Sequence, residues 1–179
     1  AGLIADPGFG KVFTDHMVTI KYSEGQGWHS ATLGPRGPLT LDPATAVLHY
    51  AQEIFEGLKA YRLADGSMAL FRPEQNARRF QRSAKRLAMP ELPEDLFLQS
   101  CRQLIEVDQH WFPPVEGGSI YLRPFMIASE VFLGVKPSAE YLYMVIAAAT
   151  GNYFKSGAPA VSLWVSKDYN RAGPGGTGA

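Results

Sequence analysis

The sequence contains a single cysteine, Cys101, among its 179 residues, so the chain cannot form an internal disulfide bond. A lone cysteine fits a reducing compartment. The sequence also has no excess of charge, because 17 Lys and Arg residues balance 17 Asp and Glu residues. A neutral balance gives no general attraction to nucleic acids or acidic membranes, so we expect neither as a partner.

Long hydrophobic runs are missing as well. Even the apolar run at residues 142–149 has the length of a strand and falls far short of the roughly 20 residues of a membrane span. Residues 1–10 lack the charged and then apolar order of a signal peptide, although the chain starts at Ala1. We therefore expect a cytoplasmic protein.

The hydrophobic periodicity changes repeatedly along the first 150 residues, which predicts both strands and helices. Asp42-Pro43 is a suitable helix start, Gly57 a suitable stop, and Asp65-Gly66 a two-residue hairpin turn. Strands are expected at 17–22, 28–33, 58–64, 67–71, 119–128 and 141–149, and helices at 44–55, 73–88 and 94–111. This segregation of strands and helices predicts an α+β fold.

The composition changes after residue 150, which predicts a domain boundary. Residues 1–150 are interpreted as a small α+β domain and residues 151–159 as a linker. A new strand is expected at 161–165, inside a second domain that begins at residue 160 and includes residues 160–179.

Five cationic residues crowd one predicted helix, with no acid between Gln75 and Pro90. They are Arg78, Arg79, Arg82, Lys85 and Arg86. One interpretation is a solvated face whose last cations favour the helix dipole. The other is that one arginine clamps a phosphate dianion, because the planar guanidinium makes paired charged hydrogen bonds. Composition alone does not select the arginine.

A second candidate is the pair Tyr121 and Arg123, which a strand would place on one face. An arginine inside an apolar strand is costly unless it meets an anion. That anion is either a structural acid of the protein or the carboxylate of a ligand.

Other kinds of site have little support. No metal site is expected, because the four histidines are scattered, and the glycine-rich residues 173–178 lack the Lys-Ser/Thr ending of a phosphate loop. Ser-His-Asp catalysis is not indicated either, because no Gly-x-Ser-x-Gly motif is present.

A set of short motifs, taken together and in order, resembles branched-chain amino-acid aminotransferases over nearly the whole chain. The motifs are Phe-Thr-Asp-His-Met at 13–17, Leu-His-Tyr at 48–50, Phe-Glu-Gly-Leu-Lys-Ala-Tyr at 55–61, Leu-Phe-Arg-Pro at 70–73 with Asn76, Arg79 and Phe80, Tyr-Leu-Arg-Pro at 121–124, Leu-Gly-Val at 133–135 and Gly-Asn-Tyr-Phe at 151–154. The resemblance implies the small N-terminal domain of a fold-type IV pyridoxal-phosphate enzyme, followed by the first strand of the larger, cofactor-binding C-terminal domain.

The resemblance also implies an activity and an assembly. The family transfers the amino group of leucine, isoleucine or valine to 2-oxoglutarate with pyridoxal 5'-phosphate as cofactor, and two subunits form the active homodimer. The expected small-molecule partners are branched-chain amino acids, glutamate and their 2-oxo acids.

Roles for individual residues follow from the matched motifs. Arg79 resembles the phosphate clamp of the cofactor site. Residues that match the walls of the substrate pocket are Phe9, Tyr50, Phe55 and Tyr153. Leu133 and Val135 match the part of the 130–140 loop that reaches the neighbouring subunit's site. Tyr121 and Arg123 match the pair that receives a second carboxylate at the far end of the pocket.

The family's catalytic lysine is expected just after Ala179, and no lysine of this chain matches it. The resemblance therefore implies that these residues belong to a longer protein, and that the 179-residue segment alone is inactive. Two alternatives stay open: a D-amino-acid aminotransferase or aminodeoxychorismate lyase of the same fold, and a non-catalytic dimerisation domain.

Overall fold

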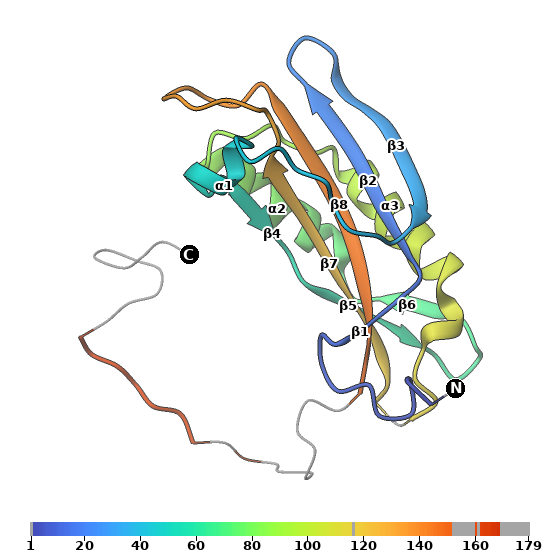
Figure 1. Cartoon of the computed structure of the whole chain (residues 1–179). Coiled ribbons are helices and arrows are strands. Elements are labelled where there is room, and N and C mark those ends of the chain that lie inside the picture. Colours follow the sequence, from blue (N-terminus) through green and yellow to red (C-terminus); the bar gives the residue numbers. More distant parts are fainter. Residues whose placement is uncertain (1, 116, 152–159, 161, 169–179) are drawn as a thin grey trace.

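The computed structural model describes residues 2–115, 117–151, 160 and 162–168 (Figure 1). Its centre is an eight-stranded sheet in which every pairing is antiparallel, with the main order β3-β2-β8-β7-β5-β6. The strands are β1 (Val12–Phe13), β2 (His16–Ser23), β3 (Gly27–Pro35), β4 (Glu53–Phe55), β5 (Leu58–Arg62), β6 (Met68–Leu70), β7 (Ser119–Ala128) and β8 (Glu140–Thr150). The short β1 pairs with β8, and β4 pairs with β7.

Two helices, α2 (Pro73–Arg86) and α3 (Glu94–Val107), cover the face of the sheet that is turned away from the viewer in Figure 1, and the segment between β3 and α1 crosses the near face. The main core lies between them and the sheet. Phe80 of α2, Phe97 of α3 and Tyr143 of β8 are fully buried there, with ring centroids 5.6–6.4 Å apart. The α+β class is confirmed, and so are the six strands and the two long helices expected from the sequence, within a few residues at their ends. None of the helices in the described residues is long and apolar enough to cross a membrane.

The helix expected at 44–55 is wrong in its second half. Helix α1 covers only Ala46–Tyr50 and ends at Ala51, whose φ of 50° is left-handed. The chain then forms β4, in which Ile54 is buried and pairs with Met126 of β7. A free edge of β7 satisfies the backbone groups of these residues, and this long-range pairing outweighs local helix propensity.

The hairpin turn between β5 and β6 is longer than the two residues expected. Leu63 N donates to Ser67 O, so three residues form the loop. Gly66 has a φ of 84°, and Asp65 Oδ1 accepts from Ser67 N at 2.9 Å. A three-residue loop with glycine in the left-handed region is a standard hairpin connection. The dipeptide therefore indicates the hairpin correctly and its length wrongly.

The strand expected at 161–165 is not formed in its described part. Residues 162–166 have no regular structure, and Trp164 is 95% exposed. A strand needs a partner for its backbone hydrogen bonds, and none of the described strands pairs with these residues. Of the expected linker at 151–159, only Gly151 lies within the described residues. The division into domains stays a prediction.

Replacing Phe80 by alanine tests the packing between helix and sheet. Phe80→Ala should lower the free energy of unfolding by about 3–5 kcal/mol, because it removes a buried ring that contacts two others. Leu87→Ala at the end of the same helix is the control; with Leu87 42% exposed, it should cost less than about 1 kcal/mol. Urea denaturation followed by circular dichroism measures both. Equal losses would contradict the described core.

Candidate functional site

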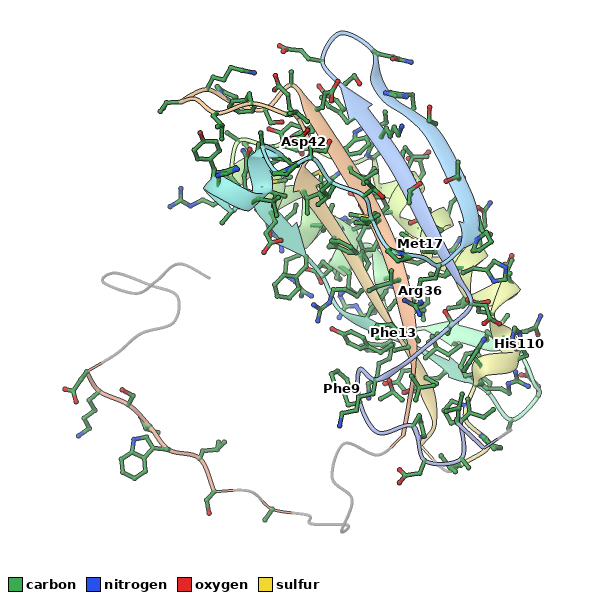
Figure 2. The ribbon with its side chains drawn as sticks, viewed as in Figure 1. Phe9, Phe13, Met17, Arg36, Asp42 and His110 are labelled. Atoms are coloured by element: carbon green, nitrogen blue, oxygen red, sulfur yellow. The ribbon has the colours of Figure 1, made fainter. Side chains whose placement is uncertain are left out.

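A pocket of about 230 Å³ opens on the face of the sheet opposite α2 and α3. Its walls are Phe9, Gly10, Phe13, Tyr121, Arg123, Ile146, Ala147 and Ala148. Phe9 and Phe13 lie next to each other beside the lower end of β8 in Figure 2, in the segment that precedes β2. The Phe9 ring meets Tyr121 edge to face, with centroids 5.1 Å apart. The pocket is therefore mainly apolar, with its polar groups concentrated on β7.

Strand alternation places Tyr121 and Arg123 together on the face that carries the pocket, as the sequence predicts. Their neighbours Ile120 and Leu122 are fully buried toward the helices. Arg123 Nη2 donates to the Tyr121 hydroxyl at 2.9 Å, and its guanidinium carbon lies 4.5 Å from the Phe55 ring centroid. Phe9, Phe55, Tyr121 and Arg123 thus form one cluster connected by direct contacts.

The Arg123 guanidinium keeps unused donor capacity. Its Nε is buried without a hydrogen-bond partner, and within the described residues no ion pair connects Arg123 to an acid. The alternative that a structural acid neutralises this arginine therefore has no support in the described part. A buried donor without a partner is costly, and the same side chain lines the pocket, where a guanidinium suits a carboxylate.

Gly57 has a role at this cluster that the sequence analysis missed. A Cβ atom built on Gly57 would overlap the hydroxyl of Tyr121. The absence of a side chain therefore lets the Tyr121 hydroxyl approach the backbone and meet Arg123. From the sequence alone, Gly57 is expected only to stop a helix, because a close approach between distant segments has no local signal.

Arg79 lies on α2 and forms a forked ion pair with Glu56. Its Nε and Nη2 donate to Glu56 Oε1 and Oε2, each at 2.6 Å. The Glu56 side chain is 4% exposed, whereas the Arg79 side chain is 55% exposed. These hydrogen bonds raise the pKa of Arg79 and keep it charged. Glu56 is a second residue that the sequence analysis missed, because nothing local connects positions 56 and 79.

Tyr50, at the end of α1, contacts the 130–140 loop. Its hydroxyl accepts a hydrogen bond from Gly134 N at 2.8 Å, and its ring stacks on Phe132 with centroids 5.9 Å apart. Leu133 is 70% exposed and Val135 is fully exposed. The structure thus divides the expected wall residues into two groups. Tyr153, the remaining one, lies outside the described residues.

Two hydrogen bonds to Glu130 brace the same loop. Glu130 Oε1 accepts from Lys136 Nζ at 2.5 Å, and Oε2 accepts from Ala139 N at 2.6 Å. Both lower the pKa of Glu130, with the Lys136 hydrogen bond as the larger cause. These contacts within the loop order its two ends, whereas Leu133 and Val135 lie exposed between them.

Asp15, Asp108 and His110 place possible metal-ligand atoms within 4.8 Å of one another. The acids already have partners: Asp108 accepts from His16 N at 3.0 Å and lies 2.6 Å from His16 Nδ1, and Asp15 accepts from the Trp111 indole at 2.9 Å. These contacts connect the start of β2 to the residues after α3, which is a structural role.

Comparisons with known proteins agree with the motifs. No protein-family model matches the chain. The chain is 61% identical over 178 residues to a branched-chain-amino-acid aminotransferase of Mycolicibacterium smegmatis, covering 99% of this chain and 48% of that protein. It is 62% identical over 180 residues to a probable branched-chain-amino-acid aminotransferase of Streptomyces coelicolor, covering 99% of this chain and 49% of that protein.

The fold is similar to that of solved enzymes in the same group. The branched-chain amino acid aminotransferase of Escherichia coli superimposes with a TM-score of 0.56 at 26% identity, over 76% of this chain and 40% of that one. A second such enzyme, solved with pyridoxamine 5'-phosphate, superimposes with a TM-score of 0.62 at 26% identity, over 82% of this chain and 43% of that one.

The chain therefore matches one part of these branched-chain aminotransferases. It spans about half the length of the curated branched-chain aminotransferases that it matches. Its sheet and helices are those of the N-terminal domain of the fold-type IV branched-chain aminotransferases, as the resemblance implies.

The brace at Glu130 should make the order of the loop depend on pH. A carboxylate whose pKa is lowered on folding stabilises the folded form above its ordinary pKa of 4.5, and this contribution is lost as the pH falls through the lower folded value. Glu130→Gln should remove this dependence and speed exchange of the Ala139 amide by about threefold or more near pH 6. Hydrogen exchange measures the protection of the Ala139 amide. The control is the Ser129 amide, which donates to the backbone oxygen of Glu140 and not to Glu130. Unchanged Ala139 protection in the variant would contradict the brace.

Proposed function

We propose that this chain supplies the small domain of a pyridoxal-phosphate-dependent aminotransferase that moves the amino group of leucine, isoleucine or valine to 2-oxoglutarate. The observation that carries the proposal is that Arg123 lines an apolar pocket and pairs with no acid among the described residues. The relatives named above support the assignment of the reaction to the group.

One pocket would have to accept two kinds of side chain. The rings of Phe9 and Phe13 with Ile146 suit a branched alkyl group, because burial of apolar surface favours binding by roughly 25 cal/mol per Å². Arg123, supported by the Tyr121 hydroxyl, suits the second carboxylate of glutamate or 2-oxoglutarate. Both groups are present without rearrangement of the backbone.

Arg79 fits the phosphate of the cofactor by its chemistry. Its guanidinium is charged, half exposed and fixed by Glu56, so it can donate to an anion outside the core. Pyridoxal phosphate, when bound, supplies an electron sink for reactions at the substrate α-carbon. The residues of this chain would bind and orient the cofactor and the substrate. The family's proton-transferring lysine is proposed to follow Ala179. The 179-residue segment alone is proposed to be inactive for that reason.

The loop and Tyr50 are proposed to act in a neighbouring subunit of a homodimer. Leu133 and Val135 are exposed, and Tyr50 fixes the loop that carries them. The exposed apolar side chains on an ordered loop support a site that is completed by a second copy. The cytoplasmic location stays a prediction.

The assignment is tested with the full-length protein that contains this segment. We expect pyridoxal-phosphate-dependent conversion of L-leucine and 2-oxoglutarate, and no conversion of D-alanine or release of pyruvate from aminodeoxychorismate. The 179-residue segment, mixed with pyridoxal phosphate and borohydride, should show no stoichiometric adduct by mass spectrometry. Activity on D-alanine alone would favour the related fold-type IV enzymes, and a dimer without cofactor affinity would favour the dimerisation domain.

Arg123 should separate the two substrate classes. In the full-length protein, Arg123→Met should lower kcat/KM for glutamate about 100-fold, because the second carboxylate loses its charged partner. The loss for L-leucine should be at least tenfold smaller. Arg62→Met is the control, since Arg62 stacks on Phe112 at 5.1 Å and does not line the pocket. Equal losses for both substrates would contradict the proposed role.

A further inference from the structure

Glu56 is a buried acid that pairs with Arg79, the proposed ligand of the cofactor phosphate. Its side chain is 4% exposed, and both of its oxygens accept from the Arg79 guanidinium at 2.6 Å. We propose that Glu56 is a positioning residue that fixes the Arg79 guanidinium for the cofactor phosphate. This inference rests on the proposed function, in which Arg79 binds that phosphate.

The geometry of the fork determines which atoms are left for an anion. Glu56 takes Nε and Nη2, which form one edge of the planar guanidinium. In the part of the chain that the structure describes, Nη1 has no hydrogen bond to a protein acceptor. A planar group held along one edge has a defined orientation, so its remaining donors occupy fixed positions.

Glu56 is itself held from three sides, which makes it a rigid support. Its backbone N donates to Pro124 O at 2.8 Å, next to Arg123 on β7. Asn76, one turn before Arg79 on α2, donates from Nδ2 to Glu56 Oε2 at 2.9 Å and to Gly57 O at 3.2 Å. The same contacts therefore connect the proposed phosphate donor to the strand that carries the proposed carboxylate donor.

The negative charge of Glu56 allows a positioning role to be distinguished from a general electrostatic effect on anion binding. Its carboxylate offsets much of the Arg79 charge, so removing it would strengthen the general attraction of the site for anions. A positioning role predicts the opposite result, because loss of the fork lets the guanidinium turn away from the phosphate. The two effects have opposite signs, which makes the neutral variant informative.

The test compares pyridoxal phosphate with pyridoxal, which lacks the phosphate, as ligands of the full-length apoenzyme. Glu56→Gln should raise the Kd for pyridoxal phosphate about tenfold and leave the Kd for pyridoxal within about twofold. The matched control is Glu94→Gln. Glu94, at the start of α3, pairs at 3.3 Å with Arg78, the exposed neighbour of Arg79 on α2. The control should change neither Kd. Equal weakening of both ligands, or tighter binding of pyridoxal phosphate, would overturn the proposal.

A second pair of variants separates this inference from the proposed function. Arg79→Lys should reduce the preference for pyridoxal phosphate over pyridoxal, and adding Glu56→Gln to it should reduce that preference no further. If Arg79→Lys leaves the preference unchanged, the phosphate contact itself is wrong. If Arg79→Lys reduces it and Glu56→Gln does not, only the positioning role is wrong.

A milder variant covers the case in which Glu56→Gln does not fold. Asn76→Ala removes one hydrogen bond to Glu56 and leaves the carboxylate paired with Arg79. It should raise the Kd for pyridoxal phosphate about threefold without affecting pyridoxal. An unchanged ratio of the two constants in this variant would count against the proposal.

Discussion

The pairing of β7 with β8 is the interaction on which the rest of the structure depends. Its register runs without a break from Ser119 opposite Thr150 to Ala128 opposite Tyr141. Because the pairing is continuous, alternate residues of both strands must face opposite sides. One side is buried against α2 and α3, and the other side carries the pocket. A slip by one residue would bury Arg123 under the helices and expose Leu122.

The two arginines of the site show different solutions to the same electrostatic cost. Arg79 is neutralised by a buried carboxylate within the chain, and its outer edge stays available. Among the described residues, Arg123 donates to the Tyr121 hydroxyl and packs on two aromatic rings. Rings and a hydroxyl compensate a buried charge less fully than a carboxylate does. Arg123 therefore lines the apolar pocket without a carboxylate partner among the described residues.

The sequence predicted what depends on local pattern and failed where distant segments meet. Alternation and helical periodicity predict β7, β8, α2 and α3, and strand geometry predicts the shared face of Tyr121 and Arg123. The fork between Glu56 and Arg79 spans 23 positions and has no local pattern. The end of α1 is decided by the free edge of β7, and the role of Gly57 by the position of Tyr121. The place of Tyr50 in the pocket wall follows from resemblance and stays a prediction, and its hydrogen bond with Gly134 of the loop has no local signal either.

The 130–140 loop is ordered although its apolar side chains are exposed. Leu133 is 70% exposed and Val135 is fully exposed, yet hydrogen bonds to Tyr50 and Glu130 order the loop that carries them. Ordering a loop costs conformational entropy, and exposed apolar side chains do not offset that cost. Preordering lowers the entropy lost on association, so the benefit appears when another surface covers the loop. The braced base and the exposed tip together therefore favour a docked role for this loop.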